Sequence, residues 1–399
     1  MAGLPIFPAH PTVRTGSNVV RILVLGGGLQ GSACALDLLR NSEAAVTLAD
    51  ARVETLAPSL RSEKGKRLQT VKLDARDHTA VLELMASHDA AASALPYYFN
   101  YDMARLAVEA GIHYADLGGN TEIVRQQEGL SEAVEGKKIS VMPDCGLAPG
   151  LVNILAAEGI RRMDTVESVK LYVGGLPQEP QPPLNYHIVY SLEGVLDYYT
   201  TPSWIIRDGK PVEVEALSEL ELVDFPQPAG SLEAFHTAGG ISTMPWTFQD
   251  RVPVMEYKTL RYPGHVEIMR AIRDLGLIDT DPVVVEAGEV RPRDLFVAVV
   301  GPKLRNPEAR DLVALKVIVR GAKADRPKQV AFELLDLYDE ELGISAMMRT
   351  TGFSLAITSL MQVGARVTRY GVAPAYEGMP FEPYVMALAK RGINISESD

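Results

Sequence analysis

Apolar residues in the first part of the chain come in short continuous runs, separated by longer segments in which they recur every three or four positions. The runs cover residues 21–25, 45–49, 68–73, 90–95, 112–115 and 139–141, and segments of helical spacing lie near 32–39, 77–87, 101–110 and 122–134. Strands that alternate with helices predict a parallel sheet with right-handed crossovers. We therefore predict an α/β domain over residues 20–155, preceded by a flexible extension over residues 1–19.

Beyond residue 155 the apolar runs follow one another through short turns. Asp208 and Gly209 separate the runs 203–207 and 212–214, which is a strong hairpin signal. Further strands are predicted at 166–174, 186–190, 220–225, 233–238, 254–261, 294–301 and 311–320, and residues 327–334 either pair back as a strand or begin a helix. This succession predicts an antiparallel or mixed sheet, and hence an α+β domain over residues 156–343.

The C-terminal part of the chain is again helical in pattern. Residues 344–366 are mostly apolar with helical spacing, and we expect the C-terminal helices within 344–399 to return to the first domain. The predicted fold class is therefore α/β, with a parallel-sheet domain into which an α+β domain with a mixed or antiparallel sheet is inserted.

The composition narrows the classes of function. The 399 residues are 47% hydrophobic and 23% charged, which is ordinary for a globular protein, and the net charge is -12. This charge argues against nucleic acid as a partner, because phosphate binding needs clustered Lys and Arg. No apolar run approaches the roughly 20 residues of a membrane span, and the N-terminus lacks the pattern of a signal peptide.

Cysteine and histidine usage narrows the chemistry further. With only two cysteines, Cys34 and Cys145, a disulfide framework is excluded and the expected compartment is the cytoplasm. The seven His are scattered, without an H-E-x-x-H motif or paired Cys, so the sequence gives no support for a metal site.

A glycine-rich turn joins the first apolar run to the first helical segment. Gly26, Gly28 and Gly31 fit the motif G-x-G-x-x-G, in which the glycines permit a tight turn, approach to a pyrophosphate and close helix–strand packing. The helix that follows presents its N-terminal N–H groups to the phosphates, which adds Leu29 and Gln30 as cofactor-binding candidates. The motif in this context predicts a Rossmann domain that binds a dinucleotide.

Asp50 ends the second run, 19 residues after Gly31, where an acid that binds the ribose is expected. Its carboxylate accepts hydrogen bonds from ribose hydroxyls and repels a 2′-phosphate, which favours NAD over NADP. Arg52 weakens this argument, since a guanidinium binds that phosphate, and NADP stays open. The other interpretation of Asp50 is a helix N-cap.

Further residues with functional potential lie where the other runs end. These are Asp74, Leu95, Pro96, Asp116, Asp144 and Cys145. Ligands of open parallel sheets bind outside the carboxyl ends of the strands. We therefore expect Asp74, Leu95 and Pro96 to contact the cofactor. We expect the segment PDCGLAPG (143–150) to lie beside the nicotinamide, where small residues let the backbone approach the ring.

Longer segments carry a family resemblance. The chain resembles the saccharopine dehydrogenase-like oxidoreductases, and among them most of all the lysine 6-dehydrogenases, in PDCGLAPGLVN (143–153), PLNYHIVYSLEGVLDYYTTPSWIIRDGK (183–210), EAFHTAGGISTMP (233–245), KTLRYPGH (258–265) and MMRTTGF (347–353). The resemblance implies an NAD(P)-binding domain, a second domain that carries the substrate pocket and dimer contacts, and a homodimer. It also implies NAD-dependent deamination of the ε-amine of L-lysine, in which the imine is hydrolysed to a semialdehyde that cyclises and ammonia is released.

Candidate substrate-binding residues lie in these segments. Arg261 is the candidate anchor of the α-carboxylate, because a guanidinium holds a carboxylate bidentately; its other interpretation is a surface ion pair. His265 either donates to the same carboxylate, relays a proton or caps the following helix. Glu193 either binds an ammonium group or is a first-turn acid favoured by the helix dipole. Tyr186 and His187 are lesser candidates, since a mid-strand Tyr usually packs in the core or at its rim.

The catalytic candidates are Asp144, Asp116 and Cys145. The ε-amine, with a reference pKa of about 10.4, must lose a proton, and a carboxylate whose pKa is raised by desolvation is suited to accept it. We rank Asp144 above Asp116 as this base; either is otherwise a turn cap. Cys145 has no neighbouring His in the sequence, and we interpret it as a wall of the pocket rather than a reactive thiol. The segment Arg349–Gly352 resembles a family motif that faces the cleft, or is a helix N-terminal turn.

Two other functions stay open. One is an NADP-linked reductase of the saccharopine- or carboxynorspermidine-forming type, which condenses an amine with an aldehyde. The other is a dinucleotide-binding regulator without catalysis. The joint presence of Arg261, Glu193 and Asp144 argues against the regulator, on the strength of the resemblance.

Overall fold

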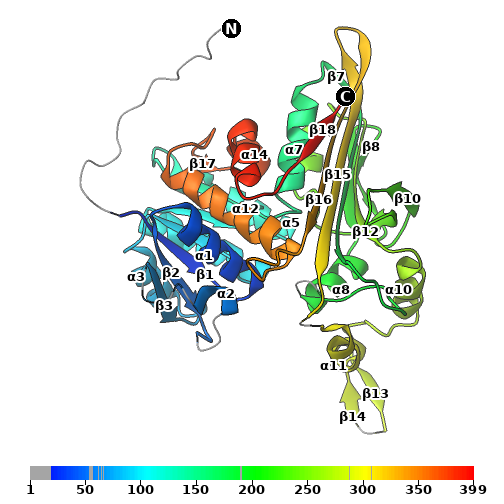
Figure 1. Cartoon of the computed structure of the whole chain (residues 1–399), viewed down its shortest axis with the longest axis horizontal. Coiled ribbons are helices and arrows are strands. Elements are labelled where there is room, and N and C mark those ends of the chain that lie inside the picture. Colours follow the sequence, from blue (N-terminus) through cyan, green and yellow to red (C-terminus); the bar gives the residue numbers. More distant parts are fainter. Residues whose placement is uncertain are drawn as a thin grey trace.

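The protein consists of two lobes, each built on a sheet, and a small protruding arm (Figure 1). The computed structural model describes residues 19–53, 57–61, 63, 65, 67–188, 191–286, 288–306 and 308–399. The parallel sheet of the first lobe and the mixed sheet of the second confirm the predicted fold class.

The sheet of the first lobe has seven strands, all parallel, in the order β17-β6-β5-β4-β1-β2-β3. They are β1 (Arg21–Leu25), β2 (Ala45–Asp50), β3 (Leu68–Lys72), β4 (Ala90–Ser93), β5 (His113–Asp116), β6 (Ser140–Met142) and β17 (Gly371–Val372). The first six lie within two residues of their predicted bounds. The strand order reverses at β1, between β2 and β4, and the ligand crevice of such sheets lies at this switch point.

Helices cover both faces of this sheet. They are α1 (Leu29–Asn41), α2 (Pro58–Arg61), α3 (His78–Met85), η1 (Tyr97–Phe99), α4 (Asn100–Ala110), α5 (Thr121–Glu128) and α6 (Ser131–Val134). Successive side chains of β1 point to opposite faces of the sheet. Ile22 and Val24 pack in one core with α1, and Leu23 and Leu25 pack in another with α3 and α4. Burial on both faces explains why these strands are continuous apolar runs.

The second lobe has a nine-stranded mixed sheet in the order β10-β11-β12-β7-β15-β16-β18, with β8 pairing with β12 and β9. Its strands are β7 (Thr165–Pro177), β8 (Ser203–Arg207), β9 (Lys210–Val214), β10 (Glu221–Asp224), β11 (Ser231–His236), β12 (Val254–Arg261), β15 (Asp311–Lys323), β16 (Arg326–Leu337) and β18 (Ser396–Ser398). The predicted hairpin at Asp208 and Gly209 is present as β8–β9, and β16 pairs back on β15.

The two lobes share one hydrophobic core. The helices of this part are α7 (Leu151–Arg161), α8 (Leu192–Thr200), α9 (Met244–Phe248), α10 (His265–Asp274), α12 (Ala346–Val363), α13 (Ala375–Gly378) and α14 (Phe381–Ala389). α12 returns to the first lobe and packs against α1, β4 and β5. A single buried cluster runs from Val24 in β1 through Leu355 in α12 and Leu155 in α7 to Val317 in β15. Within the described chain, no helix has the length and apolar character needed to cross a membrane.

The predicted strand at 294–301 is wrong, because these residues form part of helix α11 (Pro292–Leu304). The apolar run also carries a helical pattern: Phe296, Val297 and Leu304 pack against the core that contains α8, whereas Leu295 and Val299 are exposed. Pro at the first helical position also favours this start. Tertiary packing therefore overrides the β-propensity of the run. The predicted strand at 186–190 is also absent in its described part, 186–188.

Candidate active site

A cavity of about 200 Å³ lies between the strand ends of β5 and β6 in the first lobe and strands β7, β11 and β12 in the second. Its described lining is Gln30, Leu117, Gly118, Gly119, Gly146, Leu147, Ala148, Pro149, Val173, Gly175, Tyr198, Thr237, Ala238, Gly240, Tyr257, Thr259, Arg261, Met347 and Thr351. Arg261 is the one charged side chain in this set. The cavity is therefore an interlobe site with a single cationic group in its described wall.

The glycine turn between β1 and α1 has the features of a pyrophosphate site. A Cβ on Gly31 would lie 1.8 Å from the carbonyl oxygen of Gly26, so only glycine permits this approach of helix and strand. A Cβ on Gly28 would meet nothing within 4 Å. Gly28 caps α1 without a side-chain hydrogen bond, the first turn carries no acid, and Leu29 is half exposed. An uncapped helix N-terminus that faces open space fits the phosphates of a dinucleotide.

Gln30 connects this turn to the cavity. Its side chain belongs to the cavity lining, and within the part of the chain that the structure describes both amide atoms are buried without a hydrogen-bond partner. Such a group costs roughly 1–3 kcal/mol when it is left unsatisfied. A ligand that reaches from the glycine turn into the cavity would relieve this cost.

Asp50 lies at the carboxyl end of β2 and supports the same turn. Its Oδ2 accepts a hydrogen bond from the N–H of Gly27 at 2.6 Å, and its Oδ1 accepts one from the N–H of Arg52 at 2.7 Å. Each oxygen has further acceptor capacity, so the carboxylate remains suited to bind ribose hydroxyls.

The other predicted cofactor contacts do not line the cavity, although the backbone nitrogen of Leu95 would lie 3.3 Å from a Cβ on Gly26 in the glycine turn. Asp74 forms a 2.6 Å ion pair with Arg76 on the surface, and hydrogen bonds from Arg76 lower the pKa of Asp74 to about 2. Leu95 packs half-buried against the first-lobe core, and Pro96 is exposed before η1. None of these three side chains lines the cavity.

Asp116 is fully buried at the end of β5, where its carboxylate has two donors. The Nε2 of Gln127 donates to Oδ2 at 2.6 Å, and the N–H of Gly118 donates to Oδ1 at 2.8 Å. Burial raises the pKa of Asp116 to about 6, and these hydrogen bonds limit the rise. Its carbonyl also accepts a hydrogen bond from the N–H of Cys145, so Asp116 ties the ends of β5 and β6 together.

Asp144 is a second buried carboxylate, and it lacks the hydrogen-bond donors that Asp116 has. It is 2% exposed, and neither carboxylate oxygen has a hydrogen-bond partner in the described structure. Burial raises its pKa to about 7; the Ser242 hydroxyl beside it opposes this rise, and the charge of Asp116 adds to it. A Cβ on Gly118 would lie 1.9 Å from Oδ1 of Asp144, and Gly118 is part of the cavity wall. The carboxylate therefore lies directly behind that wall, where only a glycine leaves room for it.

Cys145 lies in the core and is not part of the cavity lining. Its Sγ donates to the carbonyl of Met142 at 3.2 Å, and burial raises the pKa of the thiol well above its usual range. The residues that follow, 146–149, line the cavity instead. The predicted wall is thus formed by this segment, which Asn153 holds through a 2.6 Å hydrogen bond from the N–H of Gly150 and a 3.2 Å bond to the carbonyl of Gly240.

Arg261 reaches the cavity at the end of a buried hydrogen-bond chain. Its Nε donates to the hydroxyl of Tyr199 at 3.0 Å, and that hydroxyl lies 3.0 Å from Nε2 of His265. The Nδ1 of His265 lies 2.9 Å from the carbonyl of Leu184, which can only accept. Burial, reinforced by Arg261, lowers the pKa of His265 to about 3. A neutral imidazole that donates from Nδ1 accepts from Tyr199, so His265 orients Arg261 rather than lining the cavity.

The remaining substrate-binding candidates differ in position. Tyr186 is buried with its ring 4.8 Å from the guanidinium of Arg261 and edge-on to His265, so it belongs to the same cluster. Glu193 is exposed in the first turn of α8 and is not part of the cavity lining, which matches the helix-acid interpretation. His187 is half-buried, and burial lowers its pKa.

The residues of the segment Arg349–Gly352 have different positions, some in structural contacts and one in the cavity wall. Arg349 forms a buried ion pair of 2.9 Å with Asp336 and a second ion pair with Asp339, away from the cavity. Thr351, two residues on, belongs to the cavity lining.

Sequence reasoning missed several polar groups of the cavity. Tyr198 lines it next to Gly119, whose Cβ would lie 3.2 Å from the tyrosine hydroxyl. Thr237 and Thr259 also line it, with their hydroxyls 2.7 Å apart. The spacing of Thr259 two residues before Arg261 on one strand was the available signal, because such residues share a face.

The comparisons with known proteins agree with this architecture. Residues 22–142 match the model of the saccharopine dehydrogenase NADP binding domain, and residues 146–393 match that of the saccharopine dehydrogenase C-terminal domain. The chain therefore belongs to the saccharopine dehydrogenase family, as its sequence predicted. The first of these matches supports a nicotinamide dinucleotide as the cofactor.

Individual relatives share about a quarter of the aligned residues. The chain is 26% identical over 310 residues to saccharopine dehydrogenase [NADP(+), L-glutamate-forming] of Saccharomyces cerevisiae, which covers 75% of this chain and 66% of the relative. It is 26% identical over 364 residues to the mitochondrial alpha-aminoadipic semialdehyde synthase of Mus musculus, covering 87% of this chain and 38% of the relative. It thus spans less than two thirds of the length of either relative.

A solved structure supports the fold. The apo saccharopine dehydrogenase (L-Glu forming) from Saccharomyces cerevisiae matches with a TM-score of 0.77 at 20% identity, over 95% of this chain and 99% of that one.

Proposed function

We propose that the protein is an NAD-dependent dehydrogenase that oxidises the carbon bearing the ε-amine of L-lysine. The observation that carries this proposal is Asp144, a buried carboxylate without a hydrogen-bond partner among the described residues. It lies directly behind the wall of a cavity that also contains Arg261. An ammonium group is the ligand that such a carboxylate lacks, and a carboxylate is the ligand that the guanidinium favours. An amino acid with a distal amine offers both.

The residues divide the reaction between them. Arg261, held by Tyr199, binds the α-carboxylate and so fixes the distance of the amine from the anchor. Asp144 accepts a proton from the ε-ammonium, and its raised pKa strengthens it as a base. The apolar segment 146–149 keeps water from the reacting carbon. The chemistry that a bound nicotinamide dinucleotide supplies is acceptance of a hydride, and residues 26–31 with Asp50 would hold it. Hydrolysis of the product imine then releases ammonia and a semialdehyde.

The charge of the cavity favours a substrate with one carboxylate. Saccharopine carries several carboxylates, each of which needs a donor or a cation once it is buried. Among the described lining residues Arg261 is the only cation, and the volume is about 200 Å³. Lysine fits this charge better than saccharopine does.

Asp50 favours NAD over NADP, because its carboxylate stands beside the glycine turn where a 2′-phosphate would be repelled. Arg52, two residues after Asp50, is exposed.

The second candidate function is an NADP-linked enzyme of the saccharopine-forming or saccharopine-cleaving type. The matched NADP binding domain and the NADP(+)-dependent yeast relative favour it. The third, a regulator without catalysis, has only the dinucleotide site in its favour.

An absorbance assay at 340 nm separates these functions. Purified protein is incubated with lysine and NAD+ or NADP+, with saccharopine and either cofactor, and with NADPH plus an aldehyde–amine pair. We expect NADH from lysine alone, and we expect Arg261→Ala to raise the KM for lysine. Turnover only with saccharopine and NADP+, or NADPH consumption only with the pair, would replace the proposal with the second function. Cofactor binding without turnover of any substrate would leave the regulator.

A further inference from the structure

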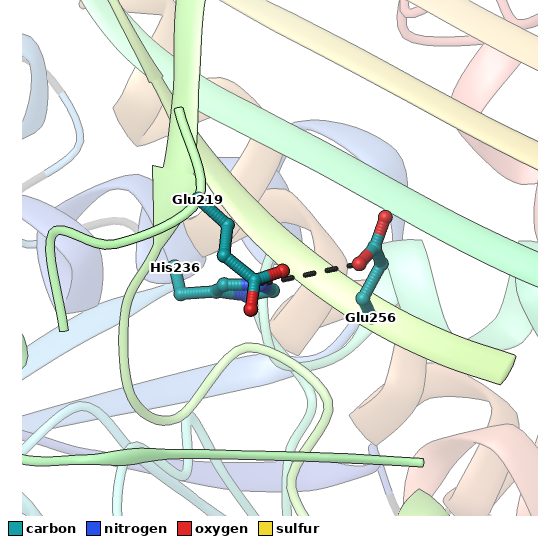
Figure 2. A group of neighbouring side chains, drawn as sticks. All are labelled: Glu219, His236 and Glu256. Atoms are coloured by element: carbon teal, nitrogen blue, oxygen red, sulfur yellow. Dashed lines mark hydrogen bonds and ion pairs between the residues drawn. The ribbon is translucent and has the colours of Figure 1, made fainter. Parts of the chain in front are cut away.

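A His residue and two Glu residues converge on the second lobe, outside the cavity. Glu219 comes from the loop before β10, His236 ends β11 and Glu256 lies in β12 (Figure 2). One ligand atom from each lies within 4.8 Å of the others. The Nε2 of His236 is 3.2 Å from Oε2 of Glu219 and 3.9 Å from Oε2 of Glu256.

The hydrogen bonds of His236 determine which of its ring nitrogens carries the proton, and they leave no donor among the three facing groups. The side chain is fully buried, and its Nδ1 lies 3.1 Å from the carbonyl oxygen of Tyr257. Since a carbonyl only accepts, Nδ1 carries the proton, and the neutral ring then presents the lone pair of Nε2 to two carboxylates. Three acceptors that face one another require a cation between them.

Charged side chains around the site contact the other atoms of the two glutamates. Arg207 pairs with the other oxygen of Glu219, and Lys170 pairs at 2.9 Å with Oε1 of Glu256. Lys258 donates to the carbonyl of Glu219 and to Glu221, each at 2.7 Å. Outer partners of this kind, above all a His N–H given to a backbone carbonyl, are typical of metal ligands.

We propose that Glu219, His236 and Glu256 bind a divalent transition-metal cation of the zinc type. Ligand atoms about 2.0–2.2 Å from a tetrahedral zinc ion lie roughly 3.4 Å from one another. The Nε2 of His236 lies 3.2 and 3.9 Å from the two carboxylates, which is near this value. Imidazole nitrogen and carboxylate oxygen are both zinc ligands, and three protein ligands leave the fourth position to water. The side chain of Glu219 is 40% exposed, which gives the ion a route from solvent.

The position of the three ligands suggests what the ion does. His236 and Glu256 lie on one face of the β11–β12 pair, and the cavity residues Thr237, Tyr257 and Thr259 alternate onto the other. A cation at this site therefore fixes the strands behind one wall of the cavity and takes no part in the reaction. This inference is independent of the proposed substrate.

Cobalt(II) titration tests the site in the full-length protein after dialysis against a chelator. We expect one Co2+ per chain, with the intense visible bands of a tetrahedral site, displaced by Zn2+. Glu219→Gln removes a partly exposed ligand and should weaken binding roughly tenfold or more, since loss of even an outer partner costs that much. Glu221→Gln is the matched control, because Glu221 lies beside the site and accepts hydrogen bonds from Lys258 and Tyr172, and no hydrogen bond or ion pair joins it to His236 in the described structure. This variant should bind Co2+ as the wild type does.

Two results would overturn the proposal. One is a wild-type protein that binds no Co2+ or Zn2+ at stoichiometric concentration; nitrogen NMR would then find both ring nitrogens of His236 protonated, with a proton as the bridging cation. The other is equal binding by Glu219→Gln and by the wild type, which would assign the metal to another site. His236→Gln, checked for folding by circular dichroism, should abolish the tetrahedral bands.

Discussion

Asp144 is the residue on which the pH dependence of the proposed reaction depends. Burial raises its pKa to about 7, so below that pH the carboxyl holds its proton and cannot accept one from the substrate. We therefore expect kcat to fall as the pH drops below about 7. Asp144→Asn should lower kcat by roughly 10²–10⁴-fold and remove this acid limb. If kcat of the variant still falls below about pH 6, the base is instead Asp116, whose pKa is raised to about 6.

The same carboxylate has a predictable effect on stability. The pKa of Asp144 is about 7 when folded and about 3.9 when unfolded, so between these values the folded state binds the proton more tightly. Stability therefore falls as the pH rises from about 4 to 7, by on the order of 4 kcal/mol at most. Asn tolerates the positive φ of 62° at this position and carries no charge.

We expect Asp144→Asn to raise Tm at pH 8 and to change it much less at pH 5. Melts monitored by circular dichroism at both values check this. Asp74→Asn is the control, since Arg76 lowers the pKa of that exposed carboxylate and its removal should give no such gain. An equal rise in Tm at both pH values would mean that the charge of Asp144 is not the cause.

At the scale of single elements, the start of helix α1 separates a structural glycine from a functional one. A Cβ on Gly31 would clash with Gly26, whereas a Cβ on Gly28 would enter open space. Gly28→Ala should thus leave Tm nearly unchanged and weaken NAD+ binding tenfold or more, about 1.4 kcal/mol. Gly31→Ala should lower Tm. Calorimetric titration with NAD+ and thermal melts test both, and NAD+ affinity unchanged in Gly28→Ala would exclude the turn as the pyrophosphate site.

The strands of the first lobe were predictable because burial on both faces leaves continuous apolar runs with little ambiguity. The run at 294–301 was not, since its β-branched residues fit a strand locally and only packing against α8 decides for a helix. The site shows the same contrast. Strand-end geometry indicated Asp116 and Asp144, but the burial of Cys145 and the exposure of Glu193 depend on tertiary packing that local pattern does not contain.

At the scale of the whole molecule, contacts between distant segments build the sites. Tyr199 and Arg261 are 62 positions apart and meet in one hydrogen-bond chain. The three proposed metal ligands come from a loop and two strands, so no spacing motif could indicate them. The resemblance at the level of family segments supplied what spacing could not, namely the prediction that the segment around Arg261 belongs to the substrate site.

The protruding arm gives the expected homodimer a physical basis. It contains the two-stranded sheet of β13 (Val283–Val285) and β14 (Gly288–Val290) next to α11 (Figure 1). Val283, Val284 and Val285 are 47%, 88% and 44% exposed. Leu295 and Val299 on α11 are each more than half exposed. An isolated two-stranded sheet is marginally stable in water, and exposed apolar patches are common at protein–protein interfaces.

We propose that a second copy of the chain covers this arm. Light scattering during gel filtration should give a dimer for the wild type and a monomer for Val284→Asp, with the circular dichroism spectrum unchanged. Met386→Asp is the control, because Met386 is 61% exposed on α14, a helix that Figure 1 shows away from the arm. A monomeric wild type, or a Val284→Asp variant that stays dimeric, would remove the arm from the interface, since an aspartate buried between two apolar surfaces is too costly to tolerate.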